Sequence, residues 1–342
     1  MRVLVATDAW HPQINGVVRS LENVAREAPA LGAEIVFVTP DMFRTLPMPS
    51  YPEIRLALAS SAAVRRKIAA VAPDFVHIAT EGPVGFAVRR VCLADGISFT
   101  TSYHTRFPEY LAARLPVPIG WSYAALRRFH NAGAGIMVST ATLERELAEK
   151  GFRGLMRWSR GVDPSLFRPR PRGAAAFPGP VFLYVGRVAV DKSIDRFLAL
   201  HLPGTKVVVG DGPARAGLEA AFPAARFLGS LTGEALAEVY AAADVFVFPS
   251  ATDTFGIVLL EALASGLPIA ALPVAGPMDV IGTSGCGVLD EDLGRAALAA
   301  LDIPREQCRA FGLSFTWEAS ARQFLDNVRR AHRAGAEFAI AS

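Results

Sequence analysis

The sequence has 342 residues, of which 51% are hydrophobic and 20% charged, with a formal net charge of +3 at pH 7. A chain of this length exceeds the size at which one hydrophobic core usually keeps growing, so we expect two domains. The apolar runs are all shorter than the roughly twenty residues of a membrane-spanning helix, and the three cysteines lack the spacing of a disulfide framework or a zinc site.

The first half of the chain alternates predicted strands and helices. Residues 2–7 form an apolar strand that no secretory signal pattern precedes, so we expect the protein to stay in the cytoplasm. The apolar pattern then predicts a helix to about residue 31, a strand at 35–38, a helix over 64–71, strands at 75–78 and 97–102, and a helix over 143–150.

A connector precedes the second half. Residues 167–180 are rich in Pro and Arg, so we place the domain boundary between residues 172 and 173. The alternation then restarts, with strands at 181–186, 207–209, near 227, 245–248 and 269–271, and helices near 194 and at 213–222, 234–242 and 255–265. Alternation in both halves predicts an α/β fold of two doubly wound parallel sheets.

The last strong helical pattern follows the second sheet. Trp317, Ala321, Phe324 and Val328 share one face of a helix, and this apolar stripe needs a packing partner. The predicted parts are residues 1–172, residues 173–314 and a helical segment over 315–342.

Charge is distributed unequally between the halves. Residues 1–177 carry a formal charge of +8, and the remainder carries −5. This asymmetry indicates that the first half faces an anionic surface.

The run from Phe246 to Gly266 predicts a buried strand, a polar loop and a helix that carries two carboxylates. Asp253 and Glu261 are eight residues apart, a little over two helical turns, so both can point the same way and accept hydrogen bonds from separate hydroxyls of one ligand. Backbone N–H groups at the helix start add a site for anions or hydroxyls. The alternative is that Asp253 is only an N-cap and Glu261 only a solvated helix residue.

This block resembles the donor-site signature of glycosyltransferase family 4, in which two acidic residues are separated by seven others. Asp253 stands where most of the family has Glu, and its side chain is one methylene shorter. The resemblance covers essentially the whole chain and implies the GT-B fold, in which two Rossmann-like domains face a cleft and the C-terminal helix crosses back to the first domain. It also implies a nucleotide-sugar donor in the cleft and retaining transfer by front-face substitution, with no metal or other cofactor.

Two cations, Arg187 and Lys192, follow the first strand of the second half. A pair of cations there suits a diphosphate, and the alternative is a pair of solvated surface charges. By resemblance they bind the pyrophosphate and neutralise the departing nucleoside diphosphate. His104 also follows a predicted strand; a lone His is more often structural, but the family has a His here that contacts the donor sugar. The predicted catalytic set is His104, Arg187, Lys192, Asp253 and Glu261.

Glycines and loop residues make up the predicted donor-binding set. Gly16 lies at a helix start where the resemblance places the donor phosphates, and a turn glycine without a ligand is the alternative. Gly210 and Gly212 form a tight strand-to-helix turn that lacks the third glycine of a dinucleotide fingerprint. Asp290-Glu291-Asp292 is interpreted as a helix start and not as a metal site. By resemblance the donor-binding residues are Gly16, Gly210, Gly212, Leu231, Thr254, Phe255, Gly256 and Val258.

Basic and aromatic residues interleave between Thr101 and Gly135, which suits a bilayer interface. The alternative is an ordinary amphipathic helix pair with a solvated face. The positive first half favours an anionic membrane surface, and the region resembles family members that glycosylate membrane lipids such as diacylglycerol. The predicted acceptor and membrane residues are Arg106, Tyr110, Trp121, Arg127 and Arg128.

The preferred hypothesis is a peripheral glycosyltransferase at the inner face of the cell membrane. It moves a hexose or uronic acid from a UDP-sugar to a lipid hydroxyl, with no nucleic-acid partner. A rival within the class uses GDP-mannose with a lipid-linked or soluble carbohydrate acceptor. A rival from another class is a hinged sugar-binding protein without catalysis, which has no need of Arg187 and Lys192 beside a diphosphate. A phosphorylase-like enzyme of the same architecture would need pyridoxal phosphate.

Overall fold

The computed structural model describes residues 1–13, 16–48, 51–112, 118–171, 177–251 and 255–340. The chain divides into two compact units. The first unit consists of Met1–Arg160 and Trp317–Ser342, and the second unit consists of Gly161–Thr316.

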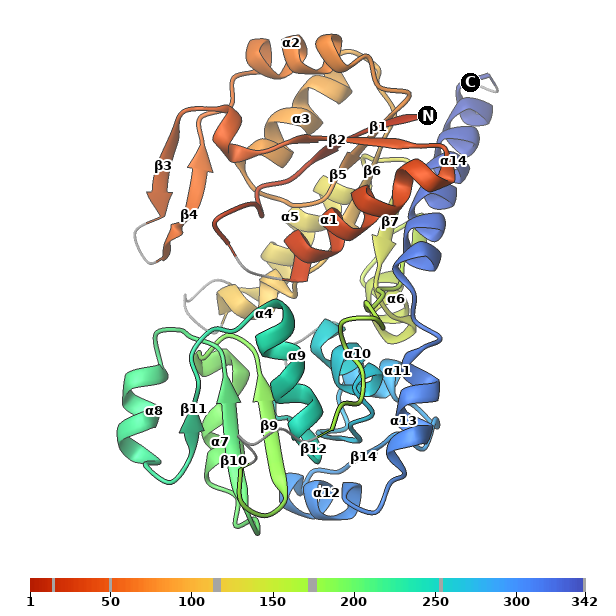
Figure 1. Cartoon of the computed structure of the whole chain (residues 1–342). Helices are drawn as coiled ribbons and strands as arrows, with labels where there is room; N and C mark the ends of the chain where they lie inside the picture. Colours follow the sequence, from red (N-terminus) through yellow and green to blue (C-terminus); the bar gives the residue numbers. More distant parts are fainter. Residues whose placement is uncertain (14–15, 49–50, 113–117, 172–176, 252–254, 341–342) are drawn as a thin grey trace. The chain divides into compact units, whose positions relative to one another are not determined.

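The first unit is built on a six-stranded parallel sheet with the order β2-β1-β5-β6-β7-β8 (Figure 1). Its strands are β1 (Arg2–Ala6), β2 (Glu34–Val38), β5 (Phe75–Ile78), β6 (Phe99–Tyr103), β7 (Gly135–Val138) and β8 (Leu155–Arg157). Its α-helices are α1 (Gly16–Glu27), α2 (Ser61–Val71), α3 (Pro83–Ala94), α4 (Phe107–Ala112), α5 (Ile119–His130), α6 (Ala141–Glu149) and α14 (Trp317–Ile340). A hairpin of β3 (Thr45–Met48) and β4 (Tyr51–Ala57) stands apart from this sheet.

Alternating residues of β1 explain how the first sheet is covered on both faces. Val3 and Val5 belong to the apolar cluster that includes side chains of α1 and α14, whereas Leu4 and Ala6 belong to the cluster that includes side chains of α2 and α3. Because successive side chains of a strand point to opposite faces, a strand covered on both sides must be apolar throughout. Side-chain caps define two of the helix starts, at Ser60 for α2 and Thr140 for α6.

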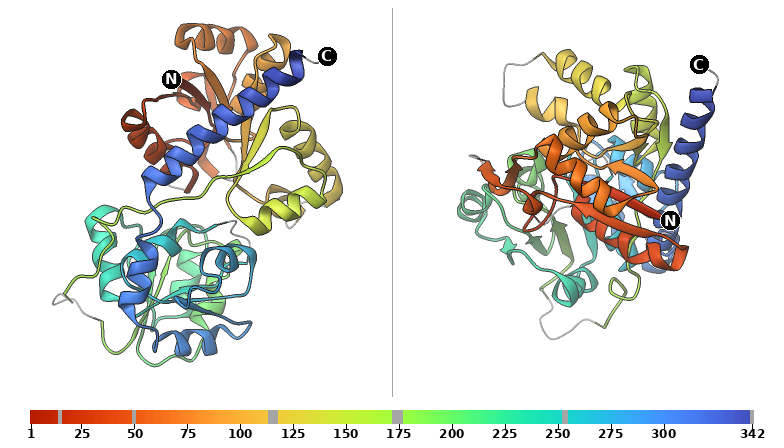
Figure 2. Two further views of the ribbon diagram at one scale, coloured as in Figure 1. Left: turned by 90° about the vertical axis from the view of Figure 1, so that its right-hand side faces the viewer. Right: turned by 90° about the horizontal axis from the view of Figure 1, so that it is seen from above.

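The C-terminal helix α14 packs on the first unit, as the sequence resemblance implies. It contacts α1, β5, β6 and β7, and Figure 2 shows it lying along the sheet. Phe324 and Val328 are buried in the same cluster as Val3 and Trp158. This packing satisfies the apolar stripe that the sequence leaves without a partner.

The second unit is built on a six-stranded parallel sheet with the order β11-β10-β9-β12-β13-β14. The strands are β9 (Val181–Val185), β10 (Thr205–Val209), β11 (Arg226–Phe227), β12 (Val245–Phe248), β13 (Ile269–Ala271) and β14 (Gly287–Leu289). The α-helices are α7 (Ile194–Leu198), α8 (Arg215–Ala221), α9 (Gly233–Ala242), α10 (Ile257–Ala264), α11 (Ala275–Val280), α12 (Leu293–Ala300) and α13 (Arg305–Gly312). The prediction of two Rossmann-like parallel sheets is therefore confirmed.

The boundary between the units lies at Arg160 and Gly161, earlier than the sequence prediction at 172 and 173. Val162 forms a β-bridge with Thr316. Phe167 is buried in the core of the second unit, where its ring packs edge-on against Tyr240 at 5.5 Å. The Pro- and Arg-rich composition of the connector does not indicate these contacts. A single buried aromatic residue is enough to fix a connector to a core. The return to the first unit falls at 316 and 317, close to the predicted 314 and 315.

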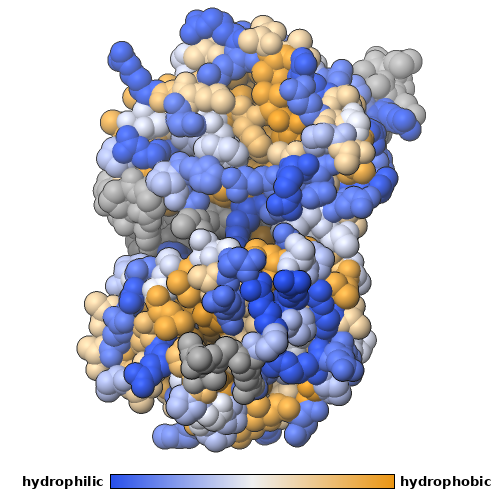
Figure 3. All heavy atoms as spheres, viewed as in Figure 1, coloured by the Kyte–Doolittle hydropathy of each residue, from blue (hydrophilic) through white to orange (hydrophobic). Residues whose placement is uncertain are grey.

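Apolar side chains are spread over the surface. On the face shown in Figure 3 they form patches that hydrophilic residues separate. In the part of the chain that the structure describes, no helix combines the length and the apolar character needed to cross a bilayer.

Because His77 in β5 is buried, we expect the first unit to lose stability in acid. Burial, with a smaller contribution from the charge of Arg160, lowers the pKa of His77 from 6.5 to about 3. Below pH 6.5 the unfolded chain therefore binds a proton that the folded chain excludes, and stability falls as the pH falls toward 3. We expect His77→Gln to reduce this slope by about 1.4 kcal/mol per pH unit between pH 6 and 4.

The first unit can be followed on its own in this experiment. All four tryptophans, Trp10, Trp121, Trp158 and Trp317, belong to it, so tryptophan fluorescence during urea unfolding reports its transition. The matched control is His332→Gln in α14, at an exposed His whose ring lies edge-on to Phe75. An unchanged slope in His77→Gln contradicts the assignment.

Candidate functional site

The strand order of the second unit reverses between β9 and β12, which are neighbours in the sheet. Ligands of open parallel sheets bind outside the carboxyl ends of the strands at such a switch point. The segments that follow β9 and β12 carry Arg187, Lys192 and Asp253. The fold therefore places the predicted cations after β9, a strand that is the neighbour of β12 in the sheet.

Arg187 is held by a partner that the sequence reasoning did not single out. Its guanidinium donates two hydrogen bonds to the Asp191 carboxylate, at 3.0 and 2.8 Å, and 40% of its side chain is exposed. Lys192 ends the short 3-10 helix η3 (Val190–Lys192) and is half-buried. The four-residue spacing of Arg187 and Asp191 was the available sequence signal.

Gly210 and Gly212 allow the turn after β10 to pack closely against the loop after β9. Val188 N–H donates to the Asp211 carbonyl at 2.8 Å, and Ala214 N–H donates to the Val188 carbonyl at 3.1 Å. A Cβ at Gly210 would overlap the Gly186 carbonyl oxygen, one at Gly212 would overlap that of Val188, and both glycines have positive φ, at 136° and 154°. The role visible here is close backbone packing of the turn after β10 against the loop that carries Arg187.

Glu261 is a buried residue and not a solvated one. Its side chain is 3% exposed, and Oε2 accepts a hydrogen bond of 2.9 Å from the hydroxyl of Tyr240 in α9. Tyr240 is itself fully buried, in the core of the second unit. The sequence did not indicate Tyr240 as a site residue, because its spacing with Leu236 and Ala237 is that of an ordinary core stripe.

The helix that carries Glu261 is shorter than predicted. α10 begins at Ile257, after Gly256 in the left-handed conformation at φ 81°, and not at residue 255. Asp253 and Thr254 lie outside the described residues. The prediction that Asp253 and Glu261 point the same way therefore stays a prediction. Gly256 needs its glycine, because its φ is positive and a Cβ would lie 3.2 Å from the ring of Phe248.

The remaining donor-set residues of the second unit pack into its core. Phe255 is 8% exposed, and Val258 and Leu231 are partly buried against the same cluster. The carbonyl of Val258 also lies 3.4 Å from the Tyr240 hydroxyl. Their assignment to the donor-binding set stays a prediction.

In the first unit, His104 follows β6 and meets a guanidinium. Arg160 donates to His104 Nδ1 at 3.1 Å, and its guanidinium lies 4.0 Å above the ring of Trp158. Arg160 is only 6% exposed, and burial lowers its pKa to about 9. Burial and then the charge of Arg160 lower the pKa of His104 well below 6.5, so the imidazole is neutral. A single Arg in a loop gave no sequence signal for this pair.

The loop after β1 holds a half-buried carboxylate. Asp8 accepts hydrogen bonds from the N–H groups of Val84 and Gly85 at 2.7 and 3.1 Å, at the start of α3. Burial raises its pKa above 3.8. Gly16 is the first residue of α1, and its carbonyl accepts a hydrogen bond from Ser20. Asp8 thus stabilises the neighbouring helix start, a role that the sequence did not reveal.

The predicted acceptor residues separate into two groups. Arg106 is largely buried, with 19% of its side chain exposed, and forms an ion pair of 2.7 Å with Glu146. Its assignment to the acceptor and membrane set stays a prediction. Trp121 is 74% exposed, and Arg127 and Arg128 are exposed on the same helix, α5. The side chain of Tyr110 lies outside the described residues.

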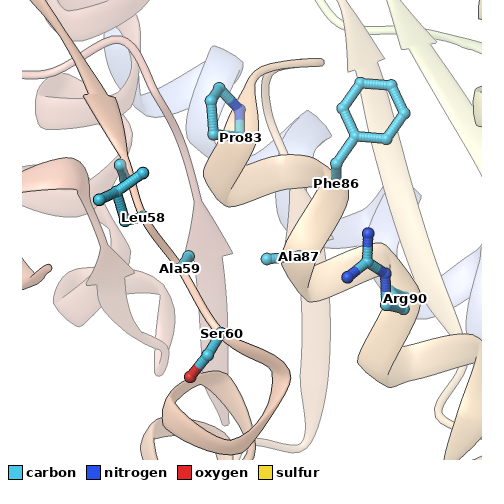
Figure 4. A pocket seen from close by; sticks show the side chains of 8 residues that line it. Leu58, Ala59, Ser60, Pro83, Phe86, Ala87 and Arg90 are labelled. Atoms are coloured by element: carbon cyan, nitrogen blue, oxygen red, sulfur yellow. The ribbon is translucent and has the colours of Figure 1, made fainter. Parts of the chain in front are cut away.

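A surface cavity of about 440 Å³ lies between α3 and the segment that joins β4 to α2 (Figure 4). Leu58 and Phe86 line it and are 60% and 49% exposed, and Arg90 stands at its edge. The ring of Phe86 packs at 4.8 Å on Phe129 of α5, so this cavity borders the helix that carries Trp121. The sequence reasoning did not predict it.

The Asp290-Glu291-Asp292 segment serves the start of α12. Asp292 accepts hydrogen bonds from the N–H groups of Gly294 and Arg295, and Asp290 is paired with the Arg295 side chain. Within the described ranges, no group of three His, Cys, Asp or Glu side chains could hold a metal ion.

Comparison with known proteins gives the family. A model described as Glycosyltransferase Family 4 matches residues 14–166, and one described as Glycosyl transferases group 1 matches residues 179–303. A GDP-mannose-dependent alpha-mannosyltransferase of Mycobacterium tuberculosis is 31% identical, over 84% of this chain and 83% of its own. The chain belongs to glycosyltransferase family 4. Family membership favours a sugar transferase over a binding protein without catalysis.

Two further relatives of this glycosyltransferase have names that differ from that of the first mannosyltransferase and from each other. A sulfoquinovosyl transferase of Arabidopsis thaliana is 31% identical over 78% of this chain, which spans 58% of the length of that relative. A GDP-mannose-dependent alpha-(1-6)-phosphatidylinositol dimannoside mannosyltransferase of Mycobacterium tuberculosis is 24% identical over 95% of each chain.

Solved structures show the GT-B fold for this glycosyltransferase. Sucrose-phosphate synthase of Thermosynechococcus elongatus aligns with a TM-score of 0.78 and 19% identity, over 97% of this chain and 99% of that one. Anabaena HepE, in complex with UDP and glucose, aligns with a TM-score of 0.73 and 14% identity, over 96% and 100%. The fold predicted from the sequence is confirmed.

The close packing at Gly210 predicts a position-specific cost. We expect Gly210→Ala to destabilise the second unit by about 2 kcal/mol or more, because the new Cβ strains the positive φ and overlaps the Gly186 carbonyl. The control is Gly217→Ala within α8, where no atom lies within 4 Å of the new Cβ. This change should stabilise by about 0.5–1 kcal/mol. Thermal unfolding followed by far-UV circular dichroism compares the two, and equal midpoints contradict the packing role.

Proposed function

We propose that this glycosyltransferase moves a hexose or uronic acid from a UDP-sugar to a lipid hydroxyl, such as that of diacylglycerol. The transfer takes place at the cytoplasmic face of an anionic membrane, with retention of configuration and without a metal. The observation that carries the lipid acceptor is the exposed apolar and basic surface of α4 and α5.

The start of α5 has the composition of a membrane contact. Trp121 is 74% exposed, and Ile119 and Phe107 are each 44% exposed. Arg128 lies two turns after Trp121 on the same face of α5, and Arg127 is next to it. Aromatic residues beside arginines suit the headgroup region of a bilayer with anionic lipids.

The cavity beside α5 supports the same acceptor class. Its apolar lining from Leu58 and Phe86 suits an acyl chain, and Arg90 at its edge suits an anionic headgroup. The relative named for a phosphatidylinositol dimannoside mannosyltransferase is a family member whose name includes a lipid acceptor.

The donor diphosphate is proposed to bind at the carboxyl ends of β9 and β12. Arg187 Nη2 already donates to both oxygens of the Asp191 carboxylate. A diphosphate presents the same kind of paired anionic oxygens and would replace Asp191 as partner of the guanidinium. Lys192 adds the second positive charge.

The proposed step balances without an enzyme nucleophile. The bond between the anomeric carbon and the diphosphate oxygen breaks, and the acceptor hydroxyl oxygen forms a bond to the same face of that carbon. The proton of this hydroxyl passes to the departing phosphate oxygen. Arg187 and Lys192 stabilise the negative charge that develops on the leaving group, while Glu261 accepts hydrogen bonds from sugar hydroxyls.

A second candidate is transfer of mannose from GDP-mannose to a lipid-linked or soluble carbohydrate acceptor. Three relatives that are 28–31% identical are named GDP-mannose-dependent alpha-mannosyltransferases. Incubation with a panel of UDP- and GDP-sugars, with diacylglycerol vesicles or soluble glycans as acceptors, distinguishes the candidates by the nucleotide released. Release of GDP alone, with a soluble product, contradicts the first proposal.

Glu261→Gln should lower turnover roughly 100-fold or more, because the amide is neutral and cannot accept as strongly from sugar hydroxyls. The Tyr240 hydroxyl can still donate to the amide oxygen, so the melting temperature should stay near that of the wild type. The control is Glu238→Gln, at an exposed position of α9. Wild-type turnover in Glu261→Gln contradicts the site.

The membrane contact predicts a charge-dependent vesicle affinity. Each arginine near an anionic surface contributes about 1 kcal/mol, so Arg127→Ser with Arg128→Ser should lower partitioning into phosphatidylglycerol vesicles roughly 30-fold at low salt. Arg322→Ser with Arg329→Ser on α14 removes the same charge elsewhere. Co-sedimentation compares the two double variants, and equal losses refute a specific contact at α5.

A further inference from the structure

Arg160 is a buried cation whose hydrogen bonds are directed at neutral groups. In the part of the chain that the structure describes, its guanidinium donates to the carbonyls of Trp158 and Ser159, at 2.7 and 3.1 Å, and to His104 Nδ1 at 3.1 Å. Burying a charge is costly unless it is hydrogen-bonded, so a purely structural role is more readily filled by an apolar residue. The position of this cation therefore points to a role at His104.

The direction of the Arg160–His104 bond determines the tautomer of the imidazole. A guanidinium carries only donors, so His104 Nδ1 must be the acceptor. A neutral imidazole has one N–H, and if Nδ1 accepts, the proton is on Nε2. His104 is therefore a hydrogen-bond donor at Nε2 and has no free lone pair there with which to act as a base.

The surroundings of His104 keep it neutral. The charged and titratable groups that bear on it are Arg160, His77 and His130, and each disfavours a proton on His104. The two neighbouring histidines are themselves hydrogen-bonded: His77 to Thr100 and Ser102, and His130 to Thr101 and Glu81. Arg160 thus polarises the imidazole without protonating it.

A shell of side chains prevents Arg160 from turning away. Its guanidinium stacks at 4.0 Å on Trp158, whose indole N–H donates to Ser320 Oγ at 3.1 Å. The Ser320 hydroxyl in turn donates at 2.8 Å to the Ser159 carbonyl, which also accepts a hydrogen bond from Arg160. Such a fixed arrangement is what a preorganised site requires of its supporting residues.

We infer that Arg160 is a positioning residue that holds His104 as the neutral Nε2–H tautomer, so that His104 donates a hydrogen bond to an oxygen atom of the bound donor sugar. The assignment of a sugar ligand rests on the proposed function. The tautomer does not, because it follows from the contacts of the first unit alone. Within that function, His104 orients the sugar and takes no proton from the acceptor.

Long-range proton–nitrogen NMR on histidine-labelled protein at pH 7 tests the tautomer directly. The spectrum of His104→Gln identifies the signals of His104, and we expect a protonated Nε2 and an unprotonated Nδ1 in the wild type. A wild-type Nδ1–H tautomer, or a doubly protonated ring, overturns the inference without any change at Arg160.

Arg160→Met then tests the cause. Methionine has a similar volume and no donor, so the preference for Nε2–H should be lost and the Nδ1–H tautomer should become populated. Arg160→Lys retains a donor and should retain more of the Nε2–H form. An Nε2–H tautomer that persists in folded Arg160→Met shows that Arg160 does not determine it.

The activity comparison uses two isosteres at His104. The amide nitrogen of Gln reaches the position of Nε2, whereas that of Asn reaches the position of Nδ1, so His104→Gln should keep a kcat/KM about tenfold above that of His104→Asn. Asn equal to or better than Gln contradicts the donor role. If every variant, including the wild type, is inactive with all nucleotide sugars while the tautomer is as expected, the proposed function fails and the positioning role stands.

Discussion

The parallel pairing of β9 with both β10 and β12 determines where the polar residues of the second unit stand. Parallel strands all end at one edge of the sheet, so the turns that follow them are forced together even though they are far apart in sequence. At the end of β10 the backbones approach so closely that Gly210 leaves no space for a side chain. These backbone contacts hold the loop that carries Arg187. The loop therefore does not depend on packing of its cationic side chains to stay in place.

Much of this arrangement could be predicted because it depends on local patterns. Strands at residues 75–78, 245–248 and 269–271 have their predicted bounds. Gly32 follows the end of the first helical segment in the left-handed conformation, as a terminating glycine does. Apolar runs and turn residues suffice for such elements, since each is determined by a few neighbouring residues. Motif spacing added the position of Glu261, and the structure shows that it is buried.

The contacts that define the site depend on long-range packing, which a single sequence does not reveal. Glu261 and Tyr240 lie on different helices, and His104 and Arg160 are 56 residues apart in the sequence. The same limit explains two differences from the sequence prediction. Arg106 is largely buried in an ion pair with Glu146, and α10 begins only at Ile257, after Gly256 in the left-handed conformation. A periodic pattern shows which residues can share a face, but not which buried partner each will find.

The return of α14 to the first unit has a consequence for synthesis on the ribosome. The apolar face formed by Val3, Val5 and Trp158 is completed by Phe324 and Val328, which are translated only after the whole second unit. The second unit can therefore close its core while the first still exposes hydrophobic surface. During that interval the nascent chain is vulnerable to aggregation, and chaperones that recognise apolar segments should engage it there.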